Sequence, residues 1–319
     1  MRRQGGTSRR AFVAQAVGMC LVRAAAPPPK SKVAIVRDAQ MRASAGALAK
    51  GLDRAVQAVY DRDNALEAWK TIARPNEVIG LKVNCLAGRG AASTSVALVE
   101  AICERLQQAG VPARNIVVWD RLNDDLESAG FHIATASGKL RCFGNDVGGY
   151  EEDLAMCGRA GSLLAKTLTR TCDAVINLPV LKDHGIVGVT MALKNLFGAI
   201  HNPNKYHSDL GDPYIADVYM LAPIRQKVRL AICDAVTAQY EGGPSYMPQW
   251  TWRFDGLIAS RDPVALDYTG WQILERKRAE MGHKSLQELH RSPQYIATAS
   301  DAAHRIGTND PARIDRVEL

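Results

Sequence analysis

Lysine and histidine side chains crowd one short stretch of the chain, residues 173–207. This stretch holds three of the seven histidines and three lysines, around a loop that contains Gly185 and Gly188. Lysines suit a carboxylate or phosphate ligand, and histidines suit metal ligation or proton transfer. An amphipathic helix with a solvated lysine edge would explain each residue taken singly. Their clustering favours a binding or catalytic site.

A strand and a helix must position these side chains. The apolar run 175–181 predicts a mostly buried strand, and Pro179 limits how far its ladder continues. Lys182 and His184 follow this run, at the carboxyl end of a strand, where α/β proteins hold ligand-facing residues. We therefore expect both side chains to face a ligand.

The next residues predict a helix that begins at Thr190 as its N-cap. At about 100° per residue, Thr190, Lys194 and His201 share one face of that helix, and His207 follows a few residues later. We expect the strand, loop and helix to fold this face toward Lys182.

Motifs in and around this stretch also carry a family resemblance. The motifs L-P-x-L-K-x-H at 178–184 and V-T-x-A-L-K-N-L-F-G at 189–198 are followed by D-A-V at 234–236 and S-R-D-P-V-A-L-D at 260–267. Together they resemble the bacterial and archaeal family named domain of unknown function 362. The resemblance implies a domain and a set of site residues, but no reaction. Some relatives carry ferredoxin-like iron–sulfur modules, and because this chain has no C-x-x-C-x-x-C run, we do not expect that cofactor.

The resemblance also marks Lys82 and Asn84, which match the family's K-x-N motif, and Asp234, which ends another apolar run. All these side chains would meet if their strands shared one parallel sheet, because its carboxyl ends lie at one edge. A metal ion is the cofactor that the histidines would suit. The predicted residues are, for catalysis, Lys182, His184, Lys194 and Asn195; for substrate binding, Lys82, Asn84, Thr190 and Asp234; and for a metal ion, His184, His201 and His207.

Apolar runs along the chain predict the fold class. Strands are predicted at 78–83, 116–119, 175–181 and 228–233, and a helix follows the first of them at 95–108. Strands that alternate with helices form βαβ units and a parallel sheet. We predict an α/β fold with a mostly parallel sheet flanked by helices, in one domain or two lobes.

Residues 1–26 predict an export signal. The sequence S-R-R-A-F at 8–12 resembles the twin-arginine motif, and the apolar segment 11–22 is too short to span a bilayer. Arginines in this segment account for five of the seven net positive charges, so the basic balance does not indicate nucleic-acid binding. We expect a periplasmic α/β domain over residues 27–319, the twin-arginine export machinery as a partner, no nucleic acid and no permanent membrane span.

The sequence leaves the reaction open. It contains no H-E-x-x-H motif, nucleophile elbow or facial carboxylate triad. One hypothesis is a metal- or cofactor-dependent enzyme that acts on a small anionic substrate. A second is a non-catalytic periplasmic protein that binds an anion or a metal, and a third is an accessory factor of a redox complex.

Overall fold

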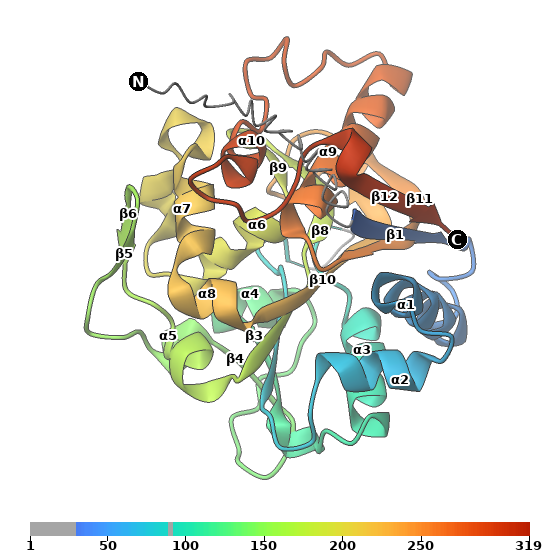
Figure 1. Ribbon diagram of the computed structural model, residues 1–319, viewed down its shortest axis with the longest axis vertical. Helices are drawn as coiled ribbons and strands as arrows, with labels where there is room; N and C mark the ends of the chain where they lie inside the picture. Colours follow the sequence, from blue (N-terminus) through green and yellow to red (C-terminus); the bar gives the residue numbers. More distant parts are fainter. Residues whose placement is uncertain (1–29, 89–91) are drawn as a thin grey trace, which may run out of the picture.

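A ten-stranded, mostly parallel sheet flanked by helices organises the computed structural model, which describes residues 30–88 and 92–319 (Figure 1). The predicted α/β fold class is therefore confirmed, whereas the predicted export signal lies outside the described residues. The strands of the sheet are β1 (Ser31–Arg37), β2 (Ile79–Lys82), β3 (Ile116–Asp120), β4 (Arg141–Gly144), β7 (Ala174–Asn177), β8 (Val180–His184), β9 (Gly188–Thr190), β10 (Val228–Gln239), β11 (Thr251–Ser260) and β12 (Ile314–Glu318). Strands β5 (Ala155–Cys157) and β6 (Ala160–Ser162) form a separate antiparallel hairpin.

The strand order is β12-β1-β11-β10-β7-β2-β3-β4, with β8 paired to β10 and β9 paired to β8. The run from β10 through β7, β2 and β3 to β4 is parallel, whereas β11 is antiparallel to both β10 and β1. Lys82 of β2 therefore lies in register with Asn177 of β7 and Trp119 of β3. The carboxyl ends of these strands meet at one edge of the sheet.

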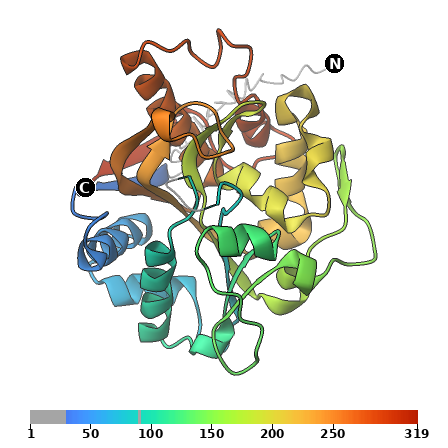
Figure 2. The same cartoon turned by 180° about the vertical axis from the view of Figure 1, so that it is seen from behind.

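Helices cover both faces of this sheet. Their bounds are α1 (Ala45–Tyr60), α2 (Ala65–Ile72), α3 (Val96–Gln108), α4 (Asn123–Ser128), α5 (Asn145–Gly148), α6 (Ala192–Asn195), α7 (Tyr214–Met220), α8 (Ala222–Lys227), α9 (Pro263–Glu280) and α10 (Tyr295–Ser300). Helices α1, α2 and α3 lie together on one side of the sheet, and α7 to α10 lie on the other, in both views (Figures 1 and 2).

Alternation of apolar residues along the strands explains the two layers. Ala34 and Val36 of β1 join the core beneath α1 to α3, whereas Val33 and Ile35 join the core beneath α6 to α10. Successive side chains of a strand point to opposite faces, so a strand buried on both faces reads as a continuous apolar run. Within the part of the chain that the structure describes, no helix has both the length and the apolar character needed to cross a membrane.

The predicted strand 175–181 is two strands. β7 ends at Asn177, and β8 starts at Val180 and pairs with the distal half of β10, where Val180 lies opposite Asp234. Pro179 has no N–H to continue the ladder, but its carbonyl accepts a hydrogen bond from the Asp234 backbone N–H at 2.8 Å. Lys182 and His184 consequently lie within β8 and do not follow a strand end.

The predicted helix from Thr190 is also much shorter than expected. Thr190 ends β9, and α6 spans only one turn before a 3₁₀ turn at Leu196–Ala199. The N-terminal N–H groups of α6 are capped from another element, because Asp267 of α9 accepts hydrogen bonds from Ala192 N at 2.7 Å and Leu193 N at 3.1 Å. Since the helical path stops early, His201 does not share a helix face with Lys194.

Candidate functional site

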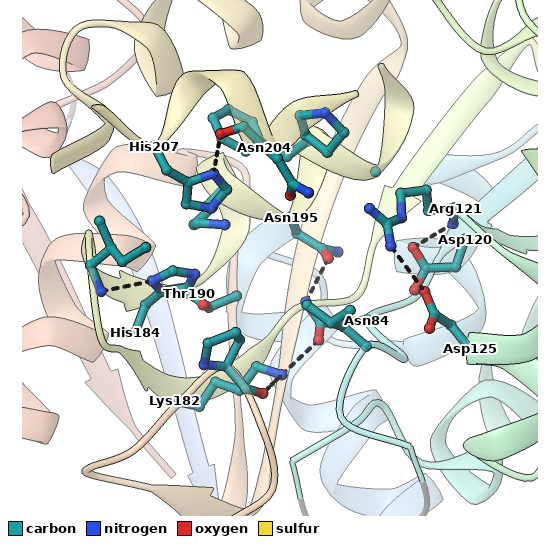
Figure 3. Close-up of a pocket in the computed structure, with 18 of the residues that line it drawn as sticks. Asn84, Asp120, Arg121, Asp125, Lys182, His184, Thr190, Asn195, Asn204 and His207 are labelled. Carbon is teal, nitrogen blue, oxygen red and sulfur yellow. Dashed lines mark hydrogen bonds and ion pairs between the residues drawn. The ribbon is translucent and has the colours of Figure 1, made fainter. Parts of the chain in front are cut away.

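A cavity of about 380 Å³ lies at the carboxyl edge of the sheet, around the ends of β2 and β3 and the β8–β9 hairpin (Figure 3). Figure 3 shows His184 and His207 on one side of it and Arg121 and Asp125 on the other. The predicted site residues that line it are Lys82, Asn84, Lys182, His184, Thr190, Lys194, Asn195 and His207. These come from segments separated by up to 125 positions, from Lys82 to His207, so the tertiary fold assembles the cluster.

Two predicted residues do not line the cavity. His201 is exposed, and its ring packs edge-on against Tyr150 with the ring centroids 5.1 Å apart. Asp234 is buried, and its carboxylate accepts hydrogen bonds from the Ser95 backbone N–H at 3.0 Å and from the Ser95 hydroxyl at 2.7 Å. Asp234 therefore fixes the start of α3 and does not face a ligand.

Lys82 is neutralised within the protein. Its Nζ donates to Asp120 Oδ1 at 2.7 Å and to the Val83 carbonyl at 2.6 Å, and both side chains of the ion pair are buried. Asp120 Oδ2 also accepts from the Cys85 backbone N–H at 2.8 Å. This pair forms a fixed floor at the carboxyl ends of β2 and β3.

The turn after α6 lies so close to the Lys82–Asp120 pair that position 198 requires a glycine. A Cβ atom there would lie 2.5 Å from Lys82 Cε and 2.7 Å from Lys82 Nζ, closer than any ordinary contact. The final glycine of the A-L-K-N-L-F-G motif thus lets the turn after α6 pack directly onto the Lys82–Asp120 pair.

Three asparagines join the floor to α6. Asn195 Oδ1 accepts from Asn84 Nδ2 at 3.0 Å, and Asn195 Nδ2 donates to Asn177 Oδ1 at 2.7 Å. Asn177 in turn donates to the Ala192 carbonyl at 2.7 Å. The prediction missed Asn177, although a polar residue inside an apolar strand was a usable signal, since a buried amide needs partners.

Lys182 is fully buried, and its hydrogen-bonding partners are all neutral. Its Nζ donates to Asn84 Oδ1 at 2.9 Å, to the Ala92 carbonyl at 2.7 Å and to the Pro244 carbonyl at 3.3 Å. Burial lowers the pKa of Lys182 to about 8. No described carboxylate lies within ion-pair distance, so the charge of Lys182 is hydrogen-bonded but not neutralised.

Lys194 differs from the other two lysines of the cavity. Its side chain is only 9% exposed, and its Nζ lies 4.9 Å from the centroid of the Phe197 ring. Among the described residues, Nζ has neither a hydrogen-bond acceptor nor an ion-pair partner. Burial, with the charges of Lys182 and Arg121, lowers the pKa of Lys194 to about 7.

The imidazoles of His184 and His207 stack with their centroids 5.3 Å apart and occupy opposite tautomers. His184 Nδ1 accepts from the backbone N–H groups of Ile186 at 3.2 Å and Val187 at 3.3 Å, so its proton is on Nε2. His207 Nδ1 lies 3.2 Å from the Asn204 carbonyl, which can only accept, so the lone pair of His207 is on Nε2. His184 is therefore a donor, and His207 is an acceptor or base.

Both imidazoles are held neutral. Burial, followed by the nearby Lys194 charge, lowers the pKa of His184 to about 2 and also lowers the pKa of His207. The Lys194 amine lines the same cavity as both rings, and it lies over Phe197, whose ring centroid is 5.7 Å from that of His207. The cavity thus combines an amine, a proton donor and a proton acceptor on one wall.

The predicted metal-binding set is not assembled. Across residues 30–88 and 92–319, no three His, Cys, Asp or Glu side chains lie close enough together to hold a metal ion. His201 lies elsewhere, and His184 could ligate through Nε2 only if Nδ1 carried the proton, which would then face two N–H donors. A ligating imidazole normally donates this proton to an acceptor.

A loop after β10 closes the cavity over β8. Asp183 Oδ1 accepts from Gly243 N at 2.7 Å, and Gly185 N donates to the Gly243 carbonyl at 2.8 Å. Arg291 forms ion pairs with Asp183 of β8 at 3.3 Å and with Glu241 of the loop at 2.6 Å. It thereby holds the loop against the strand. The predicted site residues include none from this loop and neither Arg121 nor Asp125, because nothing local shows that these residues reach the same cavity.

Comparison with known proteins places all the residues that line the cavity inside the region matched by one domain family. A family described as "Domain of unknown function (DUF362)" matches residues 79–272. The chain is also 34% identical over 121 residues to "Thylakoid-associated protein sll1697" of Synechocystis sp. (strain ATCC 27184 / PCC 6803 / Kazusa). That match covers 36% of this chain and 37% of the relative, so the two are similar over little more than a third of each.

Proposed function

The chain belongs to the DUF362 family, whose description assigns no reaction, and from the site we propose that this protein binds a small organic anion in the cavity and acts on it there. One observation carries this proposal. The Lys194 amine is buried at the cavity wall and has no acceptor or carboxylate among the described residues. A buried ammonium group is costly unless a counter-charge accompanies it, and a bound anion would supply that charge.

The charge balance of the cavity supports the same conclusion. Among the described residues, its lining contains four cationic side chains, those of Lys82, Arg121, Lys182 and Lys194, but only the carboxylates of Asp120 and Asp125. Asp120 neutralises Lys82 at 2.7 Å, and Asp125 lies 4.0 Å from Arg121. Two lysine charges remain for a ligand, which fits a carboxylate or a phosphate.

Neutral donors at the cavity wall also suit an anion. His184 presents Nε2–H, because its Nδ1 is already an acceptor. The Thr190 hydroxyl is buried without a hydrogen-bond partner among the described residues. A buried polar group without a partner calls for an explanation, and a ligand oxygen in the cavity supplies one.

Calorimetric titration with lactate, pyruvate and phosphate tests the proposal. We expect at least one of these anions to bind, and replacing Lys194 with methionine to weaken that binding at least about tenfold, which corresponds to about 1.4 kcal/mol. Lys205→Met is the matched control, since Lys205 is exposed and outside the cavity lining. Failure of all three anions to bind the natural chain, or equal affinity in Lys194→Met, would contradict the proposal.

The calorimetric titration can also measure how many protons the protein takes up when the anion binds. An anion beside Lys194 favours its charged form and raises its pKa above the starting value of about 7. Binding at pH 7.5 should therefore take up a proton, measured as a dependence of the heat on the buffer. The uptake should shrink at pH 6, where Lys194 is already charged.

A second part of the proposal is that the protein is exported and acts in the periplasm. The S-R-R-A-F sequence at 8–12 and the surrounding excess of arginine support it. We expect Arg9→Lys together with Arg10→Lys to hold the precursor in the cytoplasm of a host with twin-arginine export, as seen by cell fractionation. Arg2→Lys with Arg3→Lys is the control pair. Undiminished export of the Arg9 and Arg10 variant would refute this part of the proposal.

A further inference from the structure

Lys194 is placed to react with a carbonyl group, and we infer that it forms an imine with a small 2-oxo acid bound in this cavity. This inference rests on the proposed function, because the carboxylate of the oxo acid is the bound anion. It goes further in naming the ligand class and the covalent step. Three features of the cavity carry it: the free amine, the neighbouring imidazoles and the arrangement of the cations.

The amine of Lys194 is the one cavity lysine whose nitrogen is uncommitted among the described residues. Lys82 and Lys182 each donate to three oxygen atoms. Lys194 instead lies over the Phe197 ring, with Nζ 4.9 Å from its centroid. An amine becomes a nucleophile at neutral pH when it is desolvated or placed next to another cation. Both conditions hold here, and they lower the pKa of Lys194 to about 7.

The two imidazoles supply the proton transfers that an imine requires. Phe197, the ring beneath the amine, lies 5.7 Å from His207 between ring centroids, and His207 stacks on His184. His207 Nε2 can take a proton, and His184 Nε2–H can donate a hydrogen bond to a carbonyl oxygen. A base and a donor therefore lie on the same wall as the amine.

The reaction balances without any further reactant. His207 takes the proton of the Lys194 ammonium group, and the amine lone pair forms a C–N bond with the carbonyl carbon as the C=O π pair moves to oxygen. His207 returns that proton to this oxygen, and a second proton then passes through His207 from nitrogen to the same oxygen, which leaves as water when the C=N bond forms. Overall, one ammonium group and one carbonyl give one protonated imine and one water.

The remaining cations define where the carboxylate lies. Arg121 lines the cavity opposite the imidazoles, and its guanidinium is 4.0 Å from Asp125, too far for a strong hydrogen bond (Figure 3). Its guanidinium makes no hydrogen bond with a described residue and so can donate to a ligand, and the charge of Lys182 adds to the attraction. A carbonyl at Lys194 and a carboxylate drawn toward Arg121 and Lys182 describe a small oxo acid, and a 2-oxo acid is the smallest class that carries both groups. The volume of about 380 Å³ is near the lower end for ligand pockets, which indicates a small one.

Reduction of the imine tests the inference directly. The full chain is incubated with pyruvate, 2-oxobutyrate or 2-oxoglutarate, treated with sodium borohydride, and analysed by intact mass and peptide mapping. We expect one reduced adduct per chain, located on Lys194, and none in Lys194→Arg. Lys205→Arg should give the same adduct as the natural chain. Mapping on the natural chain needs no variant, so the test holds even if Lys194→Arg folds poorly.

The pH dependence separates Lys194 from a surface lysine. Adduct formation should rise through about pH 7 and level off by about pH 8, whereas an exposed lysine would titrate near 10.4. An adduct mapped to another lysine, or no adduct with any of the three acids, would overturn the inference. If pyruvate then still binds in the calorimeter, only the imine fails; if no anion binds, the proposed function fails as well.

Discussion

Replacing Lys82 with methionine is expected to lower the free energy of unfolding by about 3–5 kcal/mol, the usual cost of removing one partner from a buried ion pair. The substitution removes the cation that lies 2.7 Å from Asp120 Oδ1. Among the described residues, Asp120 then remains buried with only the backbone N–H groups of Cys85 and Arg121 as partners. Because these two hydrogen bonds persist, we expect a loss near the lower end of the range, measured by urea denaturation followed by circular dichroism.

The chain offers a matched control for this prediction. Lys70 forms an ion pair with Glu67 at 3.0 Å on the exposed side of α2, where such pairs contribute at most about 1 kcal/mol. Lys70→Met should therefore change stability little. Asp120→Asn added to Lys82→Met should recover part of the loss, because it removes the stranded charge. A loss for Lys82→Met no larger than for Lys70→Met would show that the Lys82–Asp120 pair does not hold the floor of the cavity.

Asn195→Ala is expected to cost about 2–4 kcal/mol, since it leaves buried hydrogen-bonding groups without partners, each at about 1–3 kcal/mol. Asn195 is 3% exposed and bonds to both Asn84 and Asn177. Asn84 is in turn an acceptor for Lys182 at 2.9 Å. The loss of the Asn195 side chain should consequently also disturb Lys182 and weaken anion binding.

Asn204→Ala provides the comparison. Asn204 is exposed, and its side chain makes no hydrogen bond with a described residue, so we expect a change within about 0.5 kcal/mol. Thermal denaturation should separate the two variants; because Asn204 also lines the cavity, anion binding by Asn195→Ala is compared with that of the natural chain. Equal stability of Asn195→Ala and Asn204→Ala would mean that the three asparagines do not act as one network.

The fold class was readable from the sequence because it depends on local periodicity. β2 and β3 lie where their apolar runs predict them, and Ser95 caps α3 as an N-cap residue should. Parallel strands with helices between them then bring their carboxyl ends to one edge. For the same reason Lys82 and Asn84 could be placed at the cavity from their positions alone, whereas Lys182 reaches it from within β8.

What the sequence could not decide was where each element stops. Pro179 was expected to shorten one strand, but the displacement of β8 onto β10 depends on a hydrogen bond from Asp234, a residue far along the chain. Likewise, α6 starts where Asp267 caps it and ends after one turn. The early end of α6 leaves His201 outside the cavity, and the hydrogen bonds from Ser95 make Asp234 a structural group.

The sequence by itself determined that lysines, histidines and asparagines gather at one sheet edge in an α/β fold. Only the tertiary structure decided their chemical states, because those depend on partners that no local pattern specifies. Lys82 forms an ion pair with Asp120, which neutralises its charge. Lys194 packs over the Phe197 ring instead, and burial lowers its pKa to about 7. Burial penalises the charge of both side chains, and a nearby opposite charge offsets this penalty for Lys82 but not for Lys194. Lys82 therefore forms a structural ion pair, whereas Lys194 is a reactive amine.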